Sequence, residues 1–110
     1  MAIPHAAPNE IIDGRTLGRA IRDDDSQTLV RTAHLEVFRY ALPNGKSVQE
    51  HTAAGLMIVQ CLEGAVAFTA LGRTQTLTRG DLLYLADGEP HSLSALADSS
   101  LLVTILLHRA

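Results

Sequence analysis

The 110-residue sequence predicts a single all-β domain, a sandwich or barrel built from short strands. From Thr28 onward, about eight short apolar or alternating segments follow one another. Turn signals such as Pro43-Asn44-Gly45 and Gly72-Arg73 separate these segments. No part of the sequence shows the sustained period of a long helix, and a chain of this length suffices for one hydrophobic core.

The expected strands lie between an N-terminal arm and the end of the chain. We expect residues 1–26 to form the arm and residues 27–110 to form the barrel domain. A short helix over residues 10–21 would contain Gly14 and Gly18, each of which costs about 1 kcal/mol relative to alanine, so the arm is expected to hold one helical turn at most. Residues 22–26 are a polar turn. The strands are expected at residues 29–31, 34–42, 56–62, 65–71, 74–78, 82–85, 91–96 and 101–107.

Composition excludes several classes of partner. The net charge is −3 and the nine Lys and Arg residues are scattered, so we expect no nucleic-acid partner. No apolar run approaches the roughly 20 residues that span a bilayer, and the first residues lack the charged and apolar regions of a signal peptide. We therefore expect a cytoplasmic protein without membrane contact. The single cysteine, Cys61, lies in an apolar run and is expected to be a buried hydrophobic residue.

Two histidines stand at fixed distances after glycines. Five residues separate Gly45 from His51, and Gly80 opens the segment that ends at Pro90-His91. In a small β-barrel, these two segments could bring the distant histidines together in one pocket. Such a pair could hold a divalent metal ion.

The spacing around His51 resembles the first sequence motif of small single-domain bacterial cupins. That motif has a glycine, a histidine after five intervening residues, a second histidine, a glutamate and a final glycine. Here Gly45, His51 and Gly64 match, whereas Ala53 and Met57 occupy the positions of the second histidine and the glutamate.

The spacing around His91 resembles the second cupin motif. Gly80, Gly88 and His91 match, whereas Ala86 and Ala95 occupy the positions of the motif's proline and asparagine. The resemblance covers residues 42–107 and implies a cupin double-stranded β-helix, or jelly-roll barrel, which is usually dimeric. It also implies a metal at the barrel mouth on three histidines and one glutamate, of which His51 and His91 are present here.

Three interpretations of these histidines remain open. His51 and His91 could hold Zn, Ni, Fe, Mn or Cu together with water, and His34 and Cys61 are candidates by residue type for a further ligand. They could instead be hydrogen-bonded polar groups at a pocket rim. They could also act without metal as ligand-binding or acid–base groups, with His91 and Tyr84 as the catalytic candidates.

Three functions follow from these interpretations. The first is a small cupin that binds a divalent metal, a small polar metabolite, or both, without turnover. The second is a cupin-type enzyme, either a metal-dependent dioxygenase or isomerase or a metal-free catalyst similar to a sugar epimerase. The third is a structural dimeric module whose pocket is filled by Leu, Met and Val side chains. His91→Ala is expected to leave the fold nearly intact, and His5 and His108 are expected to be solvated.

Two segments carry more apolar surface than a small barrel interior needs. Residues 56–62 are apolar on both faces apart from Gln60, and residues 101–107 are almost entirely apolar. We therefore expect a homodimer that covers the excess. The arm could extend a partner's sheet.

Overall fold

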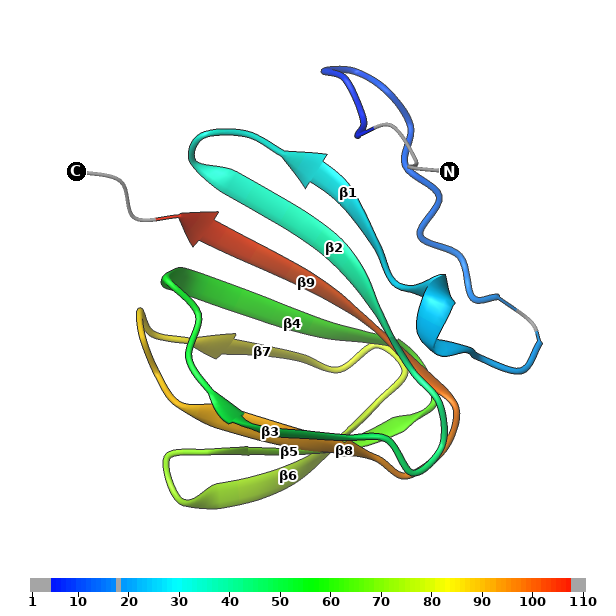
Figure 1. Cartoon of the computed structure of the whole chain (residues 1–110), viewed down its shortest axis with the longest axis vertical. Coiled ribbons are helices and arrows are strands. Elements are labelled where there is room, and N and C mark those ends of the chain that lie inside the picture. The colour runs from blue at the N-terminus through cyan, green and yellow to red at the C-terminus, as the bar shows by residue number, and fades with distance from the viewer. Residues whose placement is uncertain (1–4, 18, 108–110) are drawn as a thin grey trace.

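The barrel consists of two antiparallel sheets that face each other, as the computed structural model of residues 5–17 and 19–107 shows (Figure 1). The larger sheet has the order β1 (Gln27–Arg31), β2 (Leu35–Leu42), β9 (Ser99–Leu107), β4 (Gly55–Glu63) and β7 (Leu82–Leu85). The smaller sheet has the order β3 (Ser47–His51), β8 (His91–Ala95), β5 (Ala65–Ala70) and β6 (Arg73–Thr78). This arrangement confirms the expected all-β jelly roll.

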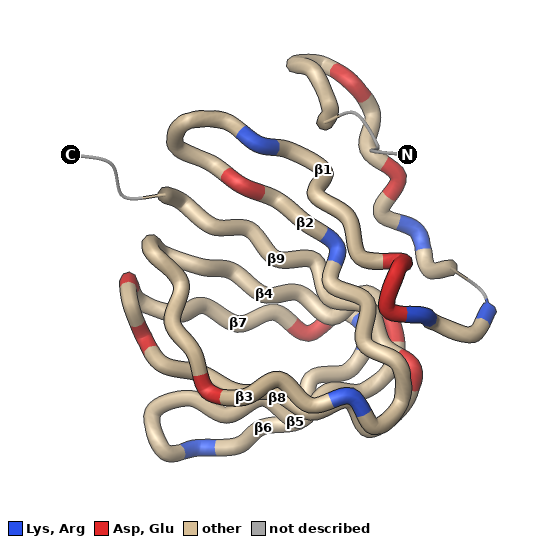
Figure 2. The backbone as a smooth tube through the Cα atoms, viewed as in Figure 1, with Lys and Arg blue, Asp and Glu red and all other residues tan. Residues whose placement is uncertain are grey.

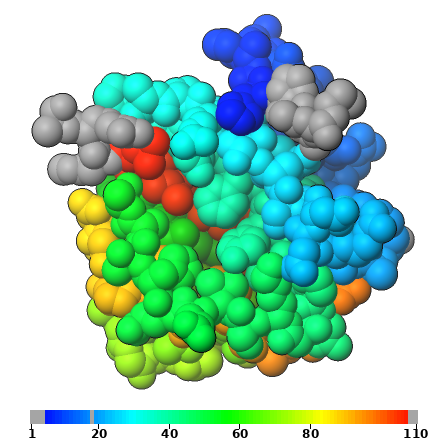
Figure 3. Space-filling view, viewed as in Figure 1, coloured from blue at the N-terminus to red at the C-terminus, as the bar shows by residue number. Residues whose placement is uncertain are grey.

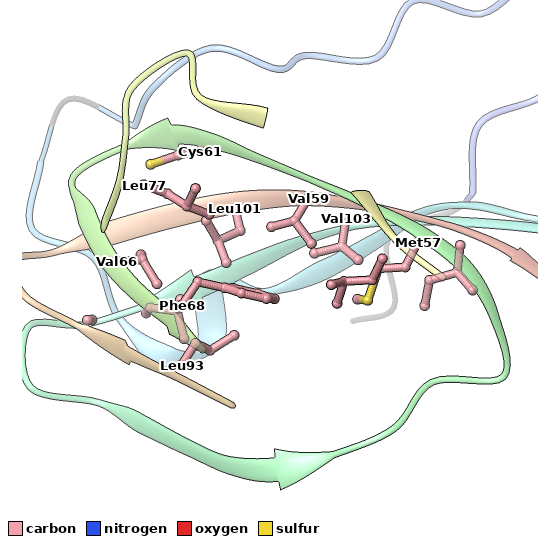
Figure 4. Close-up of a cluster of buried hydrophobic side chains, with 13 residues drawn as sticks. Met57, Val59, Cys61, Val66, Phe68, Leu77, Leu93, Leu101 and Val103 are labelled. Carbon is pink, nitrogen blue, oxygen red and sulfur yellow. The ribbon is translucent and has the colours of Figure 1, made fainter. Parts of the chain in front are cut away.

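The core lies between the two sheets because the strands alternate between buried and exposed side chains. In β4, Met57, Val59 and Cys61 point inward, whereas Leu56 and Ile58 face outward. The inward side chains of both sheets form one continuous cluster (Figure 4). Charged residues lie mainly in the turns and the arm, and β9 contains none (Figure 2).

Most of the expected strands lie within two residues of the observed ones, but one observed strand was not expected. The strand β3 was not expected, because its side chains are almost all exposed and polar and give no apolar alternation. The described part of residues 10–21 contains no helical turn. A single 3-10 turn, η1 (Asp23–Asp25), lies instead in the segment expected to be a polar turn.

The N-terminal arm is held by buried and half-buried polar groups of the larger sheet. Arg39, whose side chain is 3% exposed, lies 3.5 Å from Glu63 and donates a hydrogen bond to the carbonyl of Arg15. The Glu63 carboxylate accepts the backbone N–H of Leu17. Because a buried ion pair needs its remaining donors and acceptors satisfied, the arm completes this pair. Figure 3 shows the arm, in blue, lying against the part of the molecule that carries β1.

A second contact ties the end of the arm to the turn before β9. The Asp98 carboxylate accepts the backbone N–H groups of Asn44, at 2.8 Å, and Ile21, at 3.1 Å. These hydrogen bonds favour the ionised form and lower the pKa of Asp98 below its usual range. The first strand of the barrel, β1, begins at Gln27, directly after this contact and η1.

The turns gather at two ends of the barrel (Figure 1). At one end, which we call the mouth, β3 ends, β8 begins and the β5–β6 turn lies. At the opposite end, Ser99 bonds across the turns: its hydroxyl accepts the N–H of Ala65 at 3.0 Å and donates to the carbonyl of Ala97 at 2.7 Å. Within the described residues, no helix is long and apolar enough to span a membrane.

Gly64 permits this close approach at the end opposite the mouth. Its φ is +86°, and a Cβ placed on it would collide with the Asp98 carbonyl and with Ser99. Gly72 also has a positive φ, +70°, but a Cβ there would meet nothing within 4 Å. The two glycines therefore separate the cost of the backbone conformation from the cost of the collision.

We expect Gly64→Ala to lower the free energy of unfolding by about 3–5 kcal/mol, because conformational strain and a steric collision add. Gly72→Ala, the matched control, should cost about 1–2 kcal/mol through strain alone. Urea denaturation followed by circular dichroism measures both. Equal losses in the two variants would show that the contact with Ser99 does not constrain the fold.

Candidate functional site

The register of the smaller sheet places the two motif histidines side by side. His51 at the end of β3 pairs directly with His91 at the start of β8. Residues directly opposite in an antiparallel pair share one face of the sheet. The centroids of the two imidazole rings are 4.3 Å apart, with an angle of 58° between the ring planes. The sequence prediction that these residues meet in one pocket therefore agrees with the geometry.

Each imidazole ring has one nitrogen bonded to the backbone two residues earlier. His51 Nδ1 lies 2.9 Å from the carbonyl of Gln49, and His91 Nδ1 lies 3.0 Å from the carbonyl of Glu89. A carbonyl oxygen only accepts, so Nδ1 carries the proton in both rings. In the neutral rings, Nε2 is then left with a lone pair that can accept a hydrogen bond or bind a metal.

The two histidines differ in burial. His51 is exposed, whereas His91 is 2% exposed and stacks on Phe68, with ring centroids 5.6 Å apart and planes only 6° from parallel. His91 is therefore part of the core as well as of the site. This corrects the expectation that His91→Ala leaves the fold nearly intact, because removal of the ring would leave a void beside Phe68.

The cavity beneath the histidine pair is small and mostly apolar. Its volume of about 30 Å³ is enough for roughly one water molecule. It is lined by Phe38, Tyr40, His51, Met57, Val59, Phe68, His91, Leu93, Leu101 and Val103. The barrel interior is thus largely filled, and a molecule larger than water that contacts the histidines must lie at the mouth.

The donor set does not fit the four-ligand metal site that the cupin resemblance implies. Ala53 and Met57 occupy two ligand positions, and Met57 is buried and lines the cavity. In the described part of the chain, no group of three or more His, Cys, Asp or Glu side chains could hold a metal ion. His51 and His91 are the nitrogen donors that remain at the mouth.

Other residues singled out in the sequence lie away from the histidine pair. Tyr84, in β7, is 61% exposed and lies on the outer side of the strand, so it does not line the cavity. His34 is exposed in the turn between β1 and β2, and His5 is also exposed. Cys61 is buried away from the cavity, and burial raises the pKa of its thiol. His108 lies outside the described residues.

Sequence reasoning missed the aromatic side chains around the pair. Phe38, Tyr40 and Phe68 all line the cavity, and Phe68 fixes one face of the His91 ring. The alternation of buried residues in β5, where Val66 and Phe68 point inward, is a signal that could have identified Phe68.

A jelly-roll barrel with a histidine pair at its mouth defines a small cupin domain. Residues 34–107 match the family described as the AraC-like ligand binding domain, and the chain belongs to this family. No curated protein shows significant similarity to the sequence.

Solved structures show the same fold. A conserved protein of unknown function from Streptococcus pyogenes is 21% identical, with a TM-score of 0.75, covering 100% of this chain and 97% of that one. A cupin superfamily protein from Desulfitobacterium hafniense is 16% identical, with a TM-score of 0.74 over 98% of this chain and 99% of that one. A salicylate 1,2-dioxygenase variant from Pseudoaminobacter salicylatoxidans in complex with gentisate is 23% identical, with a TM-score of 0.67, but this chain covers only 24% of it.

We expect His91→Ala to lower the free energy of unfolding by about 2–5 kcal/mol, the range for large-to-small substitutions in a core. His51→Ala should change it by less than about 0.5 kcal/mol, because that side chain is exposed. Chemical denaturation of both variants beside the wild type measures the difference. An unchanged stability in His91→Ala would contradict the stacking role of this residue.

Proposed function

We propose that this chain is a ligand-binding cupin domain that holds a small polar molecule at the barrel mouth on His51 and His91. The observation that carries this proposal is the anchoring of both rings through Nδ1, which makes Nε2 the available acceptor of each. Neither Nε2 has a hydrogen-bond partner among the described residues. Membership of a ligand-binding family supports the same function.

The enzyme alternative has less support in the arrangement of side chains. A catalytic pair of His91 and Tyr84 needs both groups to reach one substrate atom, and Tyr84 does not share the cavity of the histidines. The purely structural alternative draws support from the filled interior. A purely structural role does not explain why two adjacent imidazoles at the mouth have free acceptor nitrogens.

The same two nitrogens favour a second candidate function, the binding of a divalent metal. Two neutral imidazoles with water in the remaining positions suit Zn²⁺, Ni²⁺ or Cu²⁺ better than Mn²⁺, which prefers oxygen ligands. The affinity should be well below that of a site with four protein ligands.

We expect tag-free protein to bind about one Zn²⁺ per chain and His51→Ala to lose this binding, because only one imidazole donor remains. Metal content by mass spectrometry and a Zn²⁺ titration followed by NMR of the histidine rings measure the loss. His34→Ala is the matched control, since it removes an exposed histidine that does not line the histidine cavity. The same zinc content in wild type and His51→Ala would reject the metal site and leave the metal-free ligand to be identified by metabolite screening.

We also propose that the protein is a homodimer that buries the outer face of its larger sheet. Leu56, Ile58, Leu82 and Leu106 project from this face and are between 38% and 61% exposed. The strands β4 and β9 run side by side there, with Leu56 opposite Leu106. A second copy fits this surface because an uncharged apolar face is complementary to itself, whereas the charged residues lie mainly elsewhere (Figure 2).

We expect Ile58→Asp to convert the dimer into a monomer, because the new carboxylate would be buried without a partner. Light scattering coupled to gel filtration measures the mass. Leu96→Asp is the control, since Leu96 is an exposed leucine in the turn between β8 and β9. A monomeric wild type, or a dimer that persists in Ile58→Asp, would reject this interface.

A further inference from the structure

The row of paired residues that contains the two histidines continues across the whole smaller sheet. His91 pairs with His51 on one side and with Ala70 on the other, and Ala70 pairs with Arg73. Directly paired residues share a face, so Arg73 starts on the same inward face as His91. The alternation in β6 agrees, because Leu77, four residues after Arg73, is buried in the core.

The spacing of the row brings the Arg73 guanidinium within reach of the mouth. Two strand spacings separate Arg73 from His91, so their Cα atoms lie about 10 Å apart. The residue between them is Ala70, whose short side chain leaves the space above it open to the long arginine. A 2.7 Å hydrogen bond between the hydroxyls of Thr69 and Thr74 fixes the β5–β6 hairpin that carries Arg73.

A groove of about 310 Å³ adjoins the histidine cavity at this point. Phe68 is their common wall, since it stacks on His91 and lines both spaces. Leu83 and Leu85 add further apolar wall to the groove, Arg73 and Gln75 supply polar side chains, and Tyr84, on the outer side of β7, borders the rim. The volume is at the lower end of the range for small-molecule sites.

The groove has a positive charge, that of Arg73, which no acidic side chain of its lining neutralises. Arg73 forms no salt bridge or side-chain hydrogen bond within residues 5–17 and 19–107, and no acidic side chain lines the groove. Arginine's planar group matches a carboxylate through two parallel hydrogen bonds. One guanidinium balances one negative charge, which favours a monocarboxylate over a phosphate dianion.

We propose that Arg73 determines specificity at the barrel mouth and that the ligand is a small monocarboxylate with an apolar body. The carboxylate binds Arg73, with Gln75 as a further donor, and the apolar body packs on Phe68, Leu83 and Leu85. The far end of the ligand reaches the histidine pair. This inference rests on the proposed function, because it names the class of molecule that His51 and His91 help to bind.

The test uses benzoate as the probe, followed by NMR of the full chain. Benzoate should shift the signals of Arg73, Gln75 and the His91 ring, whereas the neutral analogue benzamide should bind at least about tenfold more weakly. Arg73→Gln should lower the benzoate affinity by about tenfold or more, because a charge-assisted hydrogen bond is lost. Arg79→Gln, which removes an exposed arginine outside the groove, should leave the affinity unchanged.

Each contrary result overturns a stated part of this inference. Equal affinity for benzoate and benzamide in the wild type rejects the carboxylate, without reliance on any variant. Tighter binding of phenyl phosphate than of benzoate rejects the monocarboxylate class. Arg73-dependent binding that leaves the histidine signals unmoved rejects the link to the histidine pair. Loss of Zn²⁺ binding in His51→Ala together with no response to benzoate rejects this inference alone and leaves the histidine site standing.

Discussion

The pairing of β8 with β3 on one side and β5 on the other is the constraint on which the candidate site depends. It sets His91 opposite both His51 and Ala70, and it places Phe68 against the His91 ring. A shift of one residue in the pairing of β8 would turn His91 to the outer face and bring Ser92 inward, because side chains alternate along a strand. The site would then lose its buried imidazole, its stacking partner and its row of polar neighbours together.

That register is secured at the end of the barrel opposite the mouth. Ser99 bonds to Ala65 and Ala97 there, Gly64 allows the chains to approach, and the arm completes the buried pair of Arg39 and Glu63. At the mouth, the Thr69 and Thr74 hydroxyls bond to each other and Asp87 accepts the N–H of Gly55, whereas the Arg73 side chain has no such bond within the described residues. Residues that stabilise the fold and residues that can bind a ligand are thus largely separated, with His91 belonging to both sets.

The sequence predicted the strands well because each carries a local signal, either apolar alternation or a turn residue with positive φ such as Gly45. It missed β3, whose polar, exposed side chains carry no such signal, although that strand holds His51. The histidine pair could be predicted from motif spacing. The stacking of Phe68 and the position of Arg73 could not, because both depend on which residues of separate strands face each other, and local pattern does not specify that register.

Ala53 and Met57 stand where the cupin motif has metal ligands, and this difference also changes what the barrel needs in order to fold. A glutamate at position 57 would place a carboxylate at a site that is 6% exposed, and an unpaired charge there would require a metal or a cationic partner. Met57 removes that requirement, and together with Val59, Leu101 and Val103 it fills the interior with apolar side chains. An apolar side chain at position 57 therefore needs no metal to neutralise it. The ligand recognition that we propose is confined to the mouth, where His51, His91 and Arg73 share one row of the sheet.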